Sequence, residues 1–175
     1  MESTNIIGNS NIIERVLLSN TIVVGAGYSP YELPRIQQYH PNYVGVGGSS
    51  SDDIIPQMEM LGYQAITNGA DCTAEFLLDI RGGRKFNIGV VDRCVFNFFI
   101  KTKPHPLYGF KPGTNEPNGC VITVIDQNCF GIKLLQQILE PNATLYFYNS
   151  VENLNAELEA LLPGITIFED VGDGI

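Results

Sequence analysis

The sequence predicts an α/β protein in which a mostly parallel sheet of about six or seven strands carries helices on both faces. Short apolar runs stopped by glycine or an acidic residue alternate with segments whose apolar residues recur at helical spacing. Strands that alternate with helices form parallel sheets, because each helix returns the chain to the edge of the sheet where the next strand starts. No repeat or block of charge divides the 175 residues, so we expect one domain over 1–175.

The expected strands are short apolar runs interrupted by glycine, proline or polar residues. Runs such as TIVVGA lack polar alternation, which is typical of strands buried on both faces of a parallel sheet. The run FNIGVVD stops at an acidic residue, and ITIFEDV follows the last expected helix. The expected strands are 21–26, 42–48, 64–70, 86–92, 119–126, 143–150 and 165–171.

The expected helices are set by apolar spacing and by residues that start or stop helices. Pro34 limits one helix to a first turn or a kink, and Ser51 or Asp52 caps the next. Pro141 closes the helix after the fifth strand, and the final helix places four leucines on one face. The expected helices are 12–18 within a leading segment 1–20, 31–39, 50–63, 72–80, 129–139 and 151–164. This order predicts a three-layer, Rossmann-like domain.

Composition and charge exclude several classes of function. Ten basic against nineteen acidic residues give a net charge of -9, which argues against unaided, non-specific binding to nucleic acid. We find neither a run of about 18 apolar residues for a membrane span nor the pattern of a signal peptide. The four cysteines form no Cys-x-x-Cys pair. We therefore expect free thiols, a cytoplasmic protein and no metal site.

Residues that follow the strands are the candidates for a site, because parallel sheets bind ligands at that edge. The segments VVGAG, YVGVGG, NGADC and FNIGVVD resemble class I S-adenosylmethionine-dependent methyltransferases in their order and spacing, over roughly residues 20–140. The resemblance implies a glycine loop against the cofactor, an adenine contact at Asp71 and a position beside methyl transfer at Asp92. The cofactor-binding candidates are Gly25, Gly27, Tyr28, Gly47, Asp71, Cys72 and Asp92.

The sequence also departs from that family's pattern. Ser29 and Pro30 occupy the region of the third glycine of a full motif. Gly47 stands where a ribose-binding carboxylate is expected, about 20 residues beyond the glycine loop. Each candidate has a structural alternative: the glycines as sharp turns, Asp71 as a helix cap, and Asp92 as the ion-pair partner of the arginine that follows it.

The connector over 100–119 is the second candidate region, and we expect it to be a long loop. It holds three of the ten basic residues together with Tyr108 and Phe110. Long loops in compact domains often bind ligands, and basic residues interleaved with aromatics suit a phosphorylated or nucleobase-bearing substrate. His105 is a candidate general base near pH 7. The alternative is a proline-stiffened surface loop that only connects two strands.

Together these features predict a methyltransferase that uses S-adenosylmethionine, with Asp92 and His105 as the catalytic candidates. The methyl acceptor is a small molecule or a macromolecule presented by a partner, and a homo-oligomer is one option. Two alternatives stay open: a catalytically inactive methyltransferase-like domain that serves as a binding or assembly module, and a domain that binds a nicotinamide cofactor. A strand-end cleft filled by side chains such as Tyr28 would indicate the inactive module, and an open cleft the enzyme.

Overall fold

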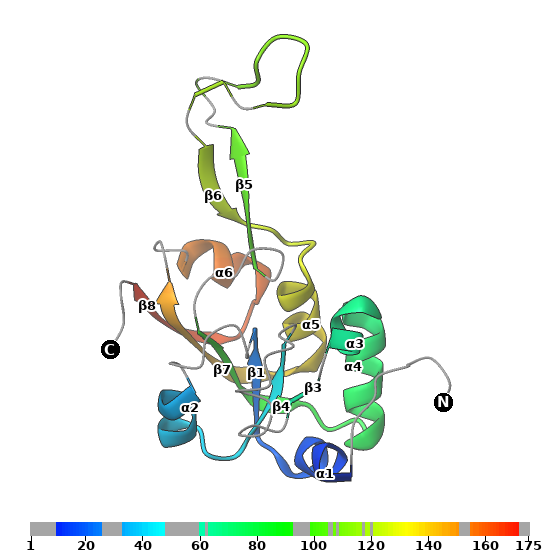
Figure 1. The fold of residues 1–175 in the computed structure, drawn as a ribbon. Coiled ribbons are helices and arrows are strands. Elements are labelled where there is room, and N and C mark those ends of the chain that lie inside the picture. Colours follow the sequence, from blue (N-terminus) through cyan, green and yellow to red (C-terminus); the bar gives the residue numbers. More distant parts are fainter. Residues whose placement is uncertain are drawn as a thin grey trace.

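The structure is a computed structural model, and it describes residues 10–25, 33–47, 60–61, 63–92, 99–104, 107, 109–116, 118–119, 121–150 and 155–171. Its centre is a parallel sheet (Figure 1) in the order β3-β2-β1-β4-β7-β8. Its strands are β1 (Thr21–Val24), β2 (Tyr43–Val46), β3 (Met60–Leu61), β4 (Phe86–Asp92), β7 (Leu139–Ser150) and β8 (Thr166–Val171). Numbered within the sheet alone, this order is 3-2-1-4-5-6, which is compatible with a Rossmann-like, doubly wound fold.

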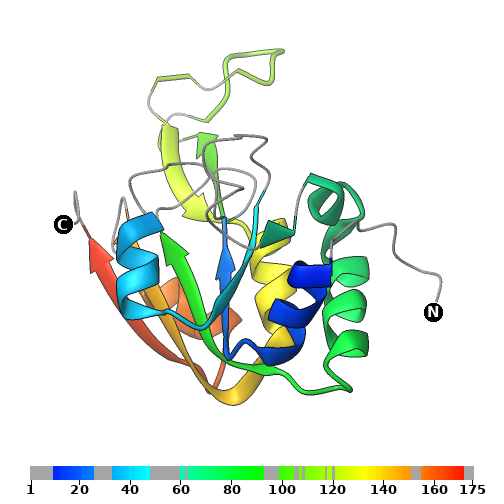
Figure 2. The ribbon, with the colours of Figure 1, turned by 60° about the horizontal axis from the view of Figure 1, so that its bottom comes forward.

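Helices lie on both faces of this sheet (Figure 2). β1 shows the division, because Ile22 and Val24 join the large core cluster while Val23 joins a smaller cluster on the opposite face. α1, α4, α5 and α6 contribute to the large cluster, and α2 contributes Ile36 to the smaller one. The helices are α1 (Ser10–Leu18), α2 (Leu33–Tyr39), α3 (Tyr63–Thr67), α4 (Gly69–Ile80), α5 (Phe130–Ile138) and α6 (Asn155–Leu161).

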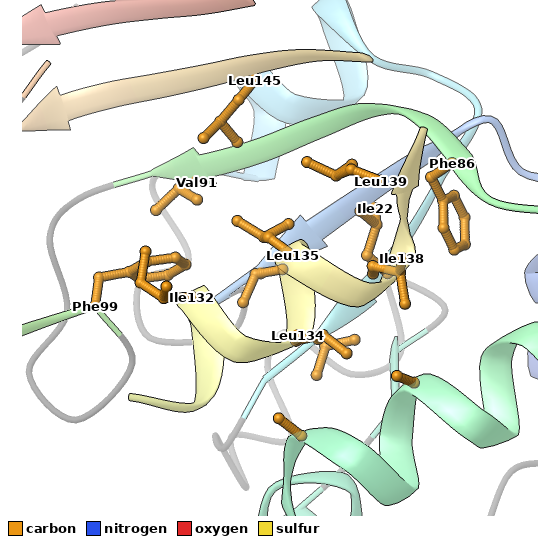
Figure 3. Packing of buried hydrophobic residues seen from close by; sticks show 14 of the residues in the cluster. Ile22, Phe86, Val91, Phe99, Ile132, Leu134, Leu135, Ile138, Leu139 and Leu145 are labelled. Atoms are coloured by element: carbon orange, nitrogen blue, oxygen red, sulfur yellow. The ribbon is translucent and has the colours of Figure 1, made fainter. Parts of the chain in front are cut away.

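The packing of α5 against the sheet forms the middle of the large cluster. Ile132, Leu135 and Ile138 of α5 lie close to Val91 of β4 and Leu145 of β7 (Figure 3). All five side chains are fully buried. Burial of a side chain of this size contributes about 1.5–3 kcal/mol relative to leaving it in water, so this layer is a major source of stability.

A buried arginine joins the end of α1 to the chain between α4 and β4. Arg81 is only 4% exposed, and its Nη1 donates hydrogen bonds of 2.7 Å to the carbonyl oxygens of both Val16 and Ser19. Its Nε donates to the carbonyl of Arg84 at 2.8 Å, and its guanidinium lies 3.8 Å from the centre of the Phe86 ring. Burial lowers the pKa of Arg81 to about 10, so the side chain is charged at neutral pH. Arg81 therefore satisfies carbonyls at a helix end that have no partner within the helix.

The alternation of parallel strands and helices is confirmed, but the strand expected at 64–70 is wrong. These residues form α3 and the start of α4, and the third strand is the two-residue β3, which lies inside the region expected as a helix at 50–63. Gly69, with φ of 86°, turns the chain between the two helices. Thr73 then ties them together, because its hydroxyl donates to the carbonyl of Ala65 at 2.6 Å. Most of the expected 50–63 helix lies outside the described residues.

An antiparallel ribbon replaces part of the loop expected at 100–119. β5 (Ile100–Pro104) pairs with β6 (Val121–Ile125), and the two strands project from the body (Figure 1). The strand expected at 119–126 therefore exists but lies outside the main sheet. Within the described residues, that sheet has five strands of four residues or more, or six with β3, where the sequence predicted six or seven.

Pro141 does not close the preceding helix as expected. α5 already ends at Ile138, and Pro141 lies inside β7, near the point where the register between β4 and β7 shifts. A proline has no N–H for the strand ladder, so its place beside an irregularity of the pairing is the usual one.

Candidate functional site

The carboxyl ends of β1 and β4 mark the point where the strand order reverses. From β1 the chain continues to β2 on one side, whereas from β4 it continues through the ribbon and α5 to β7 on the other. The two connections therefore diverge, and sheets of this type bind ligands in the crevice that such divergence leaves. This edge is the first candidate site.

β1 ends at this edge in a glycine turn. Gly25 has φ of 88°, a conformation that residues with side chains rarely adopt. Its N–H donates to the carbonyl of Val46 at 2.8 Å, and the N–H of Gly47 donates to the carbonyl of Leu61 at 3.3 Å. Both amide groups therefore extend the strand ladder by one step, and a ligand at this edge would take its hydrogen bonds from other groups.

The other candidates at this edge are only partly described. Asp92 ends β4, where its backbone is in register with Tyr148 of β7, as the sequence-based placement at a strand end predicted. The side chain of Asp92 is outside the described part of the structure, as are Gly27, Tyr28 and His105. The roles of these four residues stay predictions.

Asp71 and Cys72 do not follow a strand, because the segment before them is helical. They lie in the first turn of α4, which packs against α5. Asp71 is exposed, and its Oδ1 accepts a hydrogen bond of 2.9 Å from Nε2 of Gln137 in α5. A pocket of about 430 Å³ opens between this turn and the start of α5. Its polar lining consists of Asn68, Asp71, Cys72, Asn128 and Lys133.

This pocket combines a carboxylate, an ammonium group and two amides with the apolar side chains of Ile66 and Phe130. Such a lining offers donors and acceptors beside apolar side chains, as sites for small polar ligands commonly do. Asn128 and Lys133 were not among the sequence-based candidates. Their position immediately before and within the first turns of the expected helix at 129–139 was the signal that could have found them.

Asp126, directly after β6, organises the start of α5. Its Oδ1 accepts a hydrogen bond of 3.1 Å from the N–H of Asn128 and lies 3.6 Å from Nζ of Lys101. The hydrogen bond from Asn128, more than the lysine, holds the pKa of Asp126 below its usual value. Burial raises the pKa of the Cys129 thiol to about 11, with a further contribution from Asp126. Cys129 is therefore protonated at neutral pH, and its thiol is a weak nucleophile.

A set of stacked aromatic rings lies on the face of β7 and β8 that is opposite α5. The Tyr146 ring stacks at 5.4 Å on Phe168 and at 5.9 Å on Tyr148, measured between centroids. His40, after α2, lies 5.0 Å from the Tyr146 ring, and its Nε2 is 3.0 Å from the Tyr148 hydroxyl oxygen. Burial lowers the pKa of His40. This aromatic face (Tyr146, Tyr148 and Phe168) was not among the sequence-based candidates, although the alternation in ATLYFYNS could have indicated it.

Three further findings bear on function. Within the described residues, no group of three or more His, Cys, Asp or Glu side chains could hold a metal ion. In the same part of the chain, no helix is both long enough and apolar enough to cross a membrane. The chain matches no family model, and no curated protein and no solved structure matches it.

Proposed function

We propose that the chain binds S-adenosylmethionine at the carboxyl ends of β1 and β4 and uses it to methylate an acceptor. The observation that carries this proposal is the parallel strand order with its reversal between β1 and β4, together with the glycine turn that ends β1. When bound, S-adenosylmethionine supplies the electrophilic methyl group, and the protein has to bind, align and shield the reactants. The methyl acceptor is a small molecule or a macromolecule presented by a partner.

The described residues suit such a cofactor at the end of β1, but they supply no ribose-binding carboxylate at the end of β2. Gly25 has no Cβ and occupies a left-handed conformation, so a cofactor can approach the backbone closely where β1 ends. Gly47, at the end of β2, offers no carboxylate to the ribose hydroxyls, and its N–H is already bonded to the carbonyl of Leu61. The ribose would therefore be held by groups other than the acidic residue that is usual at this position.

Asp92 is the residue we assign to the acceptor side of the site. It ends β4, the strand adjacent to β1, and so lies across the reversal point from Gly25. A carboxylate there can orient the nucleophile of the acceptor and take up the proton that it loses on methylation. His105 is the second candidate for that proton.

Calorimetric titration with S-adenosylmethionine and S-adenosylhomocysteine tests the proposal, with a nicotinamide dinucleotide titrated in parallel. Gly25→Ala and Gly83→Ala form a matched pair, because both glycines have positive φ, at 88° and 84°. Both variants carry similar backbone strain, but only Gly25 lies at the proposed site. We expect Gly25→Ala to weaken cofactor binding at least tenfold and Gly83→Ala to leave it unchanged. Asp71→Ala would weaken binding only if the α4 pocket holds part of the cofactor.

Absence of binding at millimolar cofactor would overturn this proposal, and preferential binding of the dinucleotide would replace it. The second candidate function, an assembly module without catalysis, is favoured by one observation. The ribbon projects from the body with Leu107, Phe110 and Val121 exposed by 81%, 53% and 47% (Figure 1). Apolar side chains of this size on a projecting element are typical of an interaction surface.

A further inference from the structure

The β5–β6 ribbon is anchored in the body at its root. Ile100 and Ile125 lie opposite each other at this root and are 1% and 8% exposed. Phe99, which precedes β5, is fully buried and makes an edge-to-face contact with Phe147 of β7 at 5.7 Å (Figure 3 shows Phe99 beside α5). Beyond the root, the side chains of residues 101–103 are exposed. The ribbon is therefore fixed in position at one end and surrounded by water along most of its length.

The pairing of the ribbon continues beyond its two strands to a closed tip. The N–H of Asn118 donates to the carbonyl of Gly109 at 2.8 Å, and the N–H of Lys111 donates to the carbonyl of Glu116 at 2.8 Å. Phe110 lies between these two bonds and is 53% exposed. A two-stranded ribbon in water is marginally stable unless it packs against another surface. We therefore expect the exposed apolar side chains of this ribbon to pack against a surface other than the body of their own chain.

The aromatic face, on the side of the sheet opposite α5, is a second partly exposed apolar surface of the same chain. On the aromatic face, Phe168 is 55% exposed, and Tyr146 and Tyr148 are half-buried. Phe168 lies on β8, which is the last strand in the order of the sheet and so forms its edge. Aromatic rings at the centre of an interface contribute strongly to binding when a partner excludes water from them.

The ribbon and the rest of the chain carry net charges of opposite sign. Residues 100–125 contain three lysines and one glutamate, which give the ribbon a net charge of +2. The rest of the chain then contains seven basic and eighteen acidic residues, a net charge of -11. A basic arm and an acidic body attract each other, and this attraction speeds the encounter of two copies. The partner that best complements this ribbon is therefore another copy of the same chain.

We infer that the ribbon of one copy docks on the aromatic face of a second copy, and that the second ribbon docks reciprocally. The tip places Phe110 against Tyr146 and Phe168 of the other copy. Reciprocal docking gives a closed two-fold dimer, in which both arms and both faces are covered. This inference names the partner for the assembly role, and it does not depend on the cofactor proposal, because the association needs no cofactor.

The test measures the mass of the full-length chain in solution, without cofactor, over a range of concentrations. We expect the mass to rise from 19.2 kDa toward twice that value with concentration. Phe110→Asp removes the ribbon's contact, Phe168→Asp removes the contact of the face, and each should leave a monomer. Leu18→Asp is the matched control, because Leu18 is a 61% exposed apolar residue at the end of α1, away from the ribbon. Thermal unfolding checks that all three variants are folded.

Mixing the two variants gives the sharpest result. A dimer of one Phe110→Asp copy and one Phe168→Asp copy retains one intact ribbon on one intact face, so the mixture should recover association that neither variant shows alone. Association should also weaken as salt rises, since salt screens the attraction between arm and body. A wild-type chain that stays monomeric, a Phe168→Asp variant that still dimerises, or a mixture that recovers nothing would each overturn the inference.

Discussion

Replacing Arg81 with methionine should destabilise the protein by about 3–4 kcal/mol. The variant keeps a long apolar side chain but removes the donors to the carbonyls of Val16 and Ser19, both at 2.7 Å. Each buried carbonyl left without its donor costs about 1–3 kcal/mol, and water that reaches the exposed end of α1 recovers part of this. Loss of the guanidinium over the Phe86 ring, at 3.8 Å, adds about 1 kcal/mol.

Urea unfolding followed by circular dichroism measures this loss, because the chain has no tryptophan for a fluorescence assay. With a slope of about 1–3 kcal/mol per molar urea, the midpoint should fall by roughly 1–4 M. Arg84→Met is the control, since exposed Arg84 also donates to a carbonyl at the end of α1, that of Leu17. At the surface this loss should stay below about 1 kcal/mol. Equal losses in the two variants would refute the idea that burial gives Arg81 its importance.

Three further predictions concern a glycine, a histidine and a cysteine. Gly164→Ala should destabilise the protein more than Gly83→Ala. Both variants carry about 1 kcal/mol of backbone strain at positive φ, but only at Gly164 would the new Cβ lie 2.9 Å from a carbonyl oxygen, that of Pro141. Equal unfolding midpoints for the two variants would contradict this prediction. The pKa of His40 is lowered from 6.5 by burial, so the folded state binds fewer protons than the unfolded state and stability should fall as pH drops below 6.5. His40→Phe should flatten that pH dependence. If the stability of both proteins fell equally as the pH dropped, the prediction would be wrong. In a background where the other two cysteines are serine, half-buried Cys72 should react with a thiol reagent before buried Cys129, whose pKa is raised to about 11; simultaneous labelling would exclude this difference.

The sequence was sufficient for the alternation of parallel strands and helices, because several of the strands are short, mostly apolar runs. TIVV and residues 89–91 of β4 are buried on both faces, which is typical of a parallel sheet between helices. The third strand was missed for a physical reason, since β3 is two residues long and carries no periodicity. The strand was expected at 64–70 instead, where the glycine separates two helices rather than ending a strand. The same error placed Asp71 after a strand instead of in the first turn of α4.

The ribbon and the aromatic face needed information that lies outside local sequence. β5 starts with one buried isoleucine, and its other residues are lysine, threonine and proline. This composition favours a loop. It becomes a strand because β6, beyond a long turn, pairs with it residue by residue. The glycine turn at Gly25 could be predicted, because a strand that runs into glycines must turn there. Which residues face that turn depends on how distant segments meet, and composition does not report this.

The root of the ribbon makes it a removable module. The chain leaves the body at Ile100 and returns at Ile125, and these two residues are paired across the ribbon. The two points of exit and return are therefore neighbours, and the length of chain between them can change without moving any strand of the sheet. A short turn could close the gap, and a longer insert could carry a fluorescent or affinity tag there. The tip is thus the place on this molecule where engineering can add or remove mass at least cost to the core.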